Sequence, residues 1–289
     1  MLPISYGENS SWFRFSNYDT YETKKGVYII PSPNAARIVY NPYDLVNKLI
    51  DDYLQFGYQL FKGLDGHEKT NGALRLVRKY GLLGILTSSK YRMLLLDPKQ
   101  TIALSYDDGE FIGEKTLDEY LSDFFPVYDR QPPKEIIQAE QYMQFDSNYS
   151  EQVGWIARKA YDLYYNLKNI KDFEKTKEIE NLSDGDYIHK VISSRYHIKN
   201  IDLMIQYDED KGVTLNWEAH NLYKMIDILY ALKLIDKKTG LETCEYCGDP
   251  FLKRRRDMKY CTEECGNSSR VRKSIVNKQK NKPPKETIE

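Results

Sequence analysis

The chain has 289 residues, of which 41% are hydrophobic and 29% are charged, a composition typical of a globular protein. No apolar run approaches the roughly 18 residues that a membrane helix requires. Residues 1–10 have neither the basic flank nor the apolar stretch of a secretory signal. We therefore expect a cytoplasmic protein with no membrane partner.

The net charge of −1 conceals an uneven distribution of charge along the chain. Residues 1–243 carry 30 Lys and Arg against 36 Asp and Glu, and residues 244–289 carry 12 against 7. The two parts therefore have net charges of −6 and +5. A basic segment attached to an acidic body indicates an anionic partner for the basic end.

The first half of the chain predicts strands followed by helices. Aromatic and β-branched residues predict three strands, at 11–15, 26–30 and 36–40. Apolar residues at three- and four-residue steps then predict a helix over 42–60 and, after a break at Asp65-Gly66, a second helix over 71–86.

The middle of the chain predicts a hairpin, a short helix and then a mainly helical part. The remaining expected elements are a hairpin within 91–112, helices at 117–125, 147–168, 170–180 and 184–197, a hairpin of 201–206 with 212–216, and a helix over 217–235. Asn216 is the predicted N-cap of this last helix. Gln131-Pro132-Pro133 is the expected internal break.

All four cysteines of the chain lie within 22 residues near its C-terminus. They are Cys244, Cys247, Cys261 and Cys265. Two pairs of cysteines, with two and three residues between their members, are typical of a tetrahedral zinc site. Four thiolates close the coordination sphere, so we expect one structural zinc ion and no catalytic metal.

The residues around the cysteines predict the local backbone. Gly248 permits the positive φ of a zinc knuckle after Cys247. Thr262 is placed to cap a helix whose first turn contains Cys265. A knuckle followed by a helix N-terminus is the treble-clef arrangement, and we expect Phe251 and Tyr260 to supply its small core.

This segment resembles the CGNR zinc finger family. The matching residues are Cys244-Glu-Tyr-Cys-Gly, Phe251, Lys259-Tyr-Cys-Thr-Glu-Glu-Cys-Gly-Asn267 and Arg270-Val-Arg-Lys273. The resemblance covers roughly 40 residues of finger and implies an ABATE-like N-terminal domain and a transcriptional regulator that binds nucleic acid. One departure is Ser268, which stands where the family motif has an arginine.

Basic residues surround the second cysteine pair. The candidate nucleic-acid contacts are Lys253, Arg254, Arg255, Arg256, Arg270, Arg272 and Lys273. The first four lie in the loop between the cysteine pairs, and the others lie on the following helix. Val271 and Ile275, four residues apart, are expected to pack against the finger.

The sequence as a whole predicts an α+β fold: N-terminal strands with a helical body, followed by a small treble-clef-like zinc finger. The expected divisions are residues 1–240, 241–280 and a disordered tail, 281–289. The expected function is a non-enzymatic regulator that binds DNA or RNA through the finger, with residues 1–240 sensing a small-molecule effector or a protein partner. The alternatives are an interaction adaptor whose finger docks an acidic partner or its own body and, as the least favoured, an enzyme without a recognisable motif.

Overall fold

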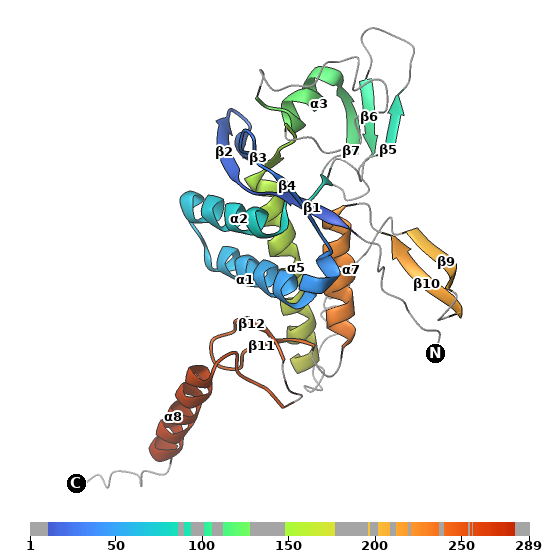
Figure 1. Ribbon diagram of the computed structural model, residues 1–289. Helices are drawn as coiled ribbons and strands as arrows, with labels where there is room; N and C mark the ends of the chain where they lie inside the picture. The colour runs from blue at the N-terminus through green and yellow to red at the C-terminus, as the bar shows by residue number, and fades with distance from the viewer. Residues whose placement is uncertain are drawn as a thin grey trace, which may run out of the picture.

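The structure is a computed structural model that describes residues 11–85, 90–93, 101–105, 112–127, 148–176, 196, 202–208, 212–218, 221–236, 240–253, 255 and 257–280. Within these ranges the chain combines short antiparallel sheets with helices, and one apolar core joins the N-terminal strands to the helices of the body (Figure 1). The predicted α+β class is therefore confirmed. Among the described helices, none has both the length and the apolar composition needed to cross a bilayer.

Strands of the N-terminal part pair in two small sheets. β1 (Trp12–Phe15) pairs with β4 (Arg37–Tyr40), and β3 (Gly26–Pro31) lies between β2 (Tyr18–Thr23) and β8 (Glu151–Gln152). The three predicted strands are confirmed. The sequence does not predict β2, because four of its six residues are exposed and leave little apolar alternation.

Two further sheets are also indicated by the sequence. β5 (Lys90–Met93) pairs with β6 (Thr101–Ser105), as predicted, and the unpredicted β7 (Ile112–Thr116) adds a third strand. The second predicted hairpin is formed by β9 (Asp202–Asp208) and β10 (Gly212–Glu218). The predicted break at 131–133 lies outside the described residues, as does the predicted helix over 184–197 except for Tyr196.

Helices α1 and α2 begin and end at local signals. A 3-10 turn, η1 (Pro42–Leu45), leads into α1 (Val46–Lys62), which ends at Gly63 in the left-handed conformation. α2 (Gly66–Tyr80) starts earlier than predicted, because the Asp65 carboxylate accepts the N–H of Glu68 at 2.7 Å and caps it. It also ends earlier, at Gly81.

The remaining body helices are α3 (Leu117–Phe124), α5 (Val153–Thr176) and α7 (Leu222–Ile235). α5 is one continuous helix where the sequence predicts two. α7 starts five residues later than predicted, because β10 runs to Glu218. The cap is therefore Asn221, which accepts the N–H of Lys224 at 2.8 Å, and not Asn216.

α1 and α5 cross closely because one residue of α1 has no side chain. A Cβ atom on Gly57 would lie 2.1 Å from the carbonyl oxygen of Ala160 on α5. The crossing brings Leu49, Tyr53 and Phe56 of α1 into the core with Leu163 and Leu167 of α5, all fully buried. It also positions these two helices, against which the C-terminal cysteine segment lies (Figure 1).

Two buried charged networks link the elements of the body. Glu151 is fully buried, and its carboxylate accepts four hydrogen bonds of 2.6–3.0 Å, from the backbone of Leu83, Gly84 and Ile85 and from the hydroxyl of Tyr149. Burial raises the pKa of Glu151. In the second network, Lys159 of α5 and Asp227 of α7 form an ion pair with side chains only 3% and 6% exposed.

Candidate metal centre

The first pair of cysteines sits on a turn between two short strands. β11 (Leu241–Thr243) pairs with β12 (Pro250–Leu252), and Cys244 and Cys247 lie on the connection between them. The N–H of Gly248 donates to the carbonyl of Cys244 at 2.9 Å. Gly248 has a φ of 81°, as the sequence predicts for a residue that must turn the chain after Cys247.

The second pair lies at the start of helix α8 (Glu263–Lys280). Thr262 Oγ1 accepts the N–H of Cys265 at 3.2 Å, so the predicted cap is present. Glu263 and Glu264 occupy the first turn, where free backbone N–H groups favour acidic side chains. A backbone N–H there lowers the pKa of Glu264, with help from the Thr262 hydroxyl. Cys265 is therefore held in a fixed first turn.

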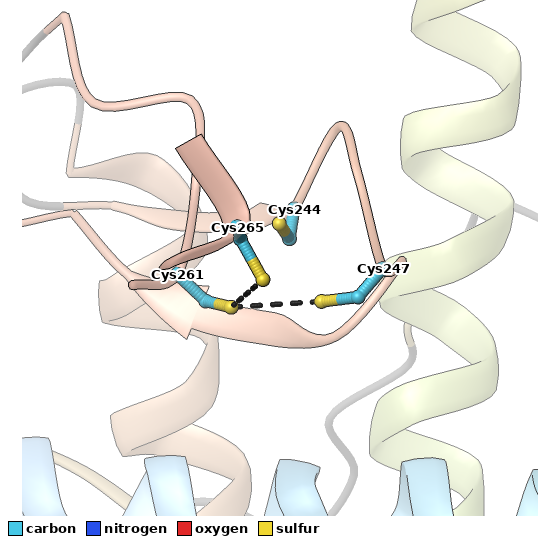
Figure 2. Close-up of side chains that lie close together, drawn as sticks. All are labelled: Cys244, Cys247, Cys261 and Cys265. Carbon is cyan, nitrogen blue, oxygen red and sulfur yellow. Dashed lines mark hydrogen bonds between the residues drawn. The ribbon is translucent and has the colours of Figure 1, made fainter. Parts of the chain in front are cut away.

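The hairpin and the helix bring the four sulfur atoms together, as Figure 2 shows. Cys261 Sγ lies 3.5 Å from Cys247 Sγ and 3.6 Å from Cys265 Sγ, and all four sulfur atoms lie within 4.8 Å of one another. These separations are far longer than the roughly 2.05 Å of a disulfide bond. Four converging thiol groups at these distances could hold a metal ion.

The thiol groups differ in acidity within the cluster. Burial raises the pKa of the Cys247 thiol, and it raises the pKa of the Cys261 thiol to about 12. Burial also opposes ionisation of Cys244, but backbone N–H groups that donate toward its sulfur outweigh it and lower the pKa to about 7. A bound cation would have to displace protons from Cys247 and Cys261, because metals bind the thiolate form.

Tyr260 packs on the first turns of α8. Its hydroxyl lies 3.0 Å from the hydroxyl of Ser269, and a Cβ atom on Gly266 would lie 3.4 Å from its ring. The backbone N–H of Glu245 donates to the carbonyl of Lys259 at 3.0 Å, which joins the knuckle to the segment before α8. Phe251, the other predicted core residue, is 6% exposed.

The cysteine hairpin docks on the body through α1. Gln55 donates its side-chain amide to the carbonyl of Pro250 at 2.6 Å, and the Tyr58 hydroxyl donates to the carbonyl of Cys247 at 3.1 Å. Leu241 and Leu252 pack with the core of the body. Sequence reasoning did not identify Gln55 or Tyr58, and no local signal could have done so, because 189 residues separate Tyr58 from Cys247.

An ion-pair network joins the same hairpin to α5. Glu242 lies 2.8 Å from the ammonium of Lys253 and 3.3 Å from that of Lys171 on α5. Burial opposes the ionisation of Glu242, but Lys253 and Lys171 outweigh it and hold the pKa of this carboxyl below its usual range. Lys253, one of the candidate nucleic-acid contacts, is therefore already engaged with a carboxylate of its own chain.

The other candidate contacts are placed differently. Arg254 and Arg256 lie outside the described residues, and Arg255 is exposed. Arg270, Arg272 and Lys273 are exposed on α8, which projects away from the body (Figure 1).

The predicted packing of Val271 and Ile275 on the finger is wrong, because these side chains are 60% and 52% exposed. The first turns of α8 face the finger through Gly266 and Ser269, and the helix turns Val271 and Ile275 away from it.

Comparison with known proteins adds no assignment to this geometry. No protein-family model matches the chain, and neither a curated protein nor a solved structure matches it. The resemblance to the CGNR zinc finger family therefore stays a prediction that rests on the residues of the finger.

Proposed function

We propose that the protein is a non-enzymatic regulator that binds nucleic acid through a structural four-cysteine zinc finger of the treble-clef type. The observation that carries this proposal is the exposure of α8: every residue from Arg270 to Ile275 is exposed, and Arg270, Arg272 and Lys273 are among them. The helix has no acidic residue after Glu264. Such a helix, fixed at one end by a metal site, is suited to contact phosphate groups.

The donor set and its spacing support zinc as the metal. Tetrahedral zinc with Zn–S bonds of about 2.3 Å requires sulfur atoms roughly 3.8 Å apart. The separations of 3.5 and 3.6 Å around Cys261 are close to that value. Cys244, Cys247, Cys261 and Cys265 would hold the ion, which would fix the relative positions of the knuckle and α8. Four thiolates leave no open position, so the ion is proposed to be structural.

The position where the CGNR motif has an arginine lies close to the exposed basic residues of α8. Ser268 occupies that position here, and Arg270 lies two residues later with its guanidinium 3.4 Å from the side-chain oxygen of Asn267. Arg270 is thus on the exposed part of α8, close to the cysteine cluster. We propose that it supplies the phosphate contact that Ser268 cannot make.

The test removes three charges from α8 and compares the result with an equal removal elsewhere. The variant changes Arg270, Arg272 and Lys273 to Gln, and the matched control changes Lys24, Lys48 and Arg75, which are exposed on the body, to Gln. Both variants have the same net charge. Binding to duplex and single-stranded DNA and RNA is measured by fluorescence anisotropy over a range of salt concentrations.

The α8 variant should bind more weakly and show a flatter log–log salt dependence, by roughly 0.9 for each lost contact with duplex phosphate. The control variant should bind like the wild type. Equal weakening in the two variants would mean that only net charge matters. Absence of wild-type binding at low salt would contradict the proposal and favour the adaptor function, for which the docking of the finger on α1 is the supporting observation.

A further inference from the structure

The exposed part of α8 carries apolar and basic side chains next to one another. Val271 and Ile275 are 60% and 52% exposed. Residues 265–280 contain five basic residues, no acidic residue and no aromatic residue. Exposed apolar side chains on a strongly basic helix indicate a partner that offers both negative charge and apolar groups.

The helix places an arginine on each side of the apolar pair. At about 100° per residue, Val271 and Ile275 lie only about 40° apart around the helix axis. Arg272 follows about 60° beyond Ile275, and Arg270 lies about 100° from Val271 in the opposite direction. The apolar pair is therefore a narrow stripe between two arginines, and Lys273 lies on the opposite side of the helix.

α8 is held at its start and extends away from the body. The Thr262 hydroxyl caps the first turn, and Gly266 and Ser269 contact Tyr260 of the finger. Every residue from Arg270 to Ile275 is exposed, on a helix that projects from the body (Figure 1). A helix with its side chains is about 10–12 Å across, and the major groove of B-form DNA is about 12 Å wide. The exposed turns of α8 are therefore of a size to enter this groove.

The composition and arrangement of α8 favour duplex DNA over other nucleic acids. The phosphates of the two strands line the two sides of the major groove, and its floor displays the C5-methyl groups of thymine. An apolar stripe between two arginines is complementary to such a groove. Sites for single strands stack bases on aromatic side chains, which residues 265–280 lack. The major groove of an RNA duplex is too deep and narrow for side chains to read.

We propose that α8 enters the major groove of duplex DNA, where Val271 and Ile275 contact thymine methyl groups and Arg270 and Arg272 contact phosphates of the two strands. This inference rests on the proposed function, and it adds the form of the nucleic acid and the residues that distinguish base pairs. Phosphate contacts carry no sequence information directly, whereas contacts with base edges do. The apolar stripe therefore gives the protein a preference for A·T pairs beneath it.

The test isolates the thymine methyl group. Two DNA duplexes of equal length and alternating A·T sequence are compared, of which one contains thymidine and the other deoxyuridine. Deoxyuridine keeps the base pairing and the phosphates and lacks only the C5-methyl group. An A·U RNA duplex and a single strand of thymidine nucleotides, both of the same length, are the further probes. Binding of the full-length protein is measured by fluorescence anisotropy.

The test variant carries Val271→Ala and Ile275→Ala, which shorten the apolar stripe without changing the charge. Alanine is the best helix former, so α8 should stay helical. The matched control carries Val39→Ala and Ile235→Ala, which alter side chains that are 63% and 73% exposed on β4 and α7. Circular dichroism verifies that each variant is folded.

The wild type and the control should bind the thymidine duplex more tightly than the deoxyuridine duplex, by roughly fourfold for each methyl group that is buried. In the test variant this ratio should fall towards one. The log–log salt dependence of the test variant should equal that of the wild type, because no charge is removed. The wild type should bind the RNA duplex and the single strand more weakly than the thymidine duplex.

Two results would overturn this inference and leave nucleic-acid binding by the finger intact. One is equal affinity of the wild type for the thymidine and deoxyuridine duplexes, and the other is tighter binding to the RNA duplex or the single strand. A thymidine preference that persists in the test variant would also contradict the roles of Val271 and Ile275. A wild type that binds none of these probes at low salt would overturn the inference and the proposed function together.

Discussion

The hydrogen bond between α1 and the knuckle predicts that a residue of the body affects metal affinity. Tyr58 donates its hydroxyl to the carbonyl of Cys247 at 3.1 Å. This carbonyl is held in place by the turn that four metal-bound thiolates would fix. Without metal the small finger has little to order the turn, so the hydrogen bond should form together with metal binding. Tyr58→Phe removes only the hydroxyl.

The expected loss follows from the energy of one hydrogen bond. A hydrogen bond of this kind contributes about 1 kcal/mol, which corresponds to a roughly fivefold weaker affinity for zinc. Competition between the protein and a chromophoric chelator of known affinity measures this change at constant pH. The matched control is Tyr165→Phe, which removes a hydroxyl from a side chain on α5 that is 44% exposed. It should leave zinc affinity unchanged.

The outcome that refutes this reasoning is equal zinc affinity in Tyr58→Phe and the wild type. It would mean that the knuckle keeps its conformation and its contact with α1 without metal. Docking on the body, and not the metal, would then order the hairpin. If Tyr165→Phe weakened zinc affinity as much as Tyr58→Phe does, the reasoning would also be contradicted. The change could then not be assigned to the hydrogen bond with the Cys247 carbonyl.

Elemental analysis is expected to find one zinc ion per chain in the wild type. The double variant Cys261→Ser, Cys265→Ser should lose this ion. An unchanged zinc content in the variant would mean that other residues are the ligands. Glu151→Gln should lower the free energy of unfolding in urea by about 1–3 kcal/mol, because its amide nitrogen would face a backbone N–H. Because burial raises the pKa of Glu151, the folded state binds the carboxyl proton more tightly than the unfolded state does. The free energy of unfolding of the wild type should therefore fall as the pH rises from the pKa of Glu151 in the unfolded state to its pKa in the folded state. The same pH dependence in Glu151→Gln would assign it to another group. Asp227→Asn should lower the free energy of unfolding by about 3–5 kcal/mol because it breaks a buried ion pair. Asp162→Asn breaks an exposed pair and should lower it by under about 0.5 kcal/mol. Similar losses in the two variants would show that the burial of the ion pair does not matter here.

The elements that sequence reasoning places well are those with a strong local pattern. α3 and the strands β1, β3 and β4 lie within a residue or two of their predicted positions. Two of the misplaced helix starts, those of α2 and α7, share one cause: a residue that fits two roles. Asp65 fits the end of one helix by its sequence context, and it is the cap of the next. Asn216 fits a cap in the same way, but it lies within β10 and pairs with Met204 of β9.

The cluster of cysteines was predictable from sequence because its geometry is local. Each pair is held by one turn of backbone, at Gly248 and at Thr262, and only the approach of the two pairs had to be inferred. The residues that dock this unit, Gln55 and Tyr58, could not be inferred. They belong to a helix far away in the chain, and their contacts depend on the crossing of α1 and α5 at Gly57.

Sequence by itself determined which residues converge and what chemistry their thiol groups offer, because ligand spacing and capping act over a few residues. Only the tertiary structure decided which charges and apolar groups remain exposed. Lys253 is paired with Glu242, whereas Arg270, Arg272 and Lys273 are exposed on a projecting helix. Exposure depends on what the rest of the chain covers, and that is set by the packing of the whole fold.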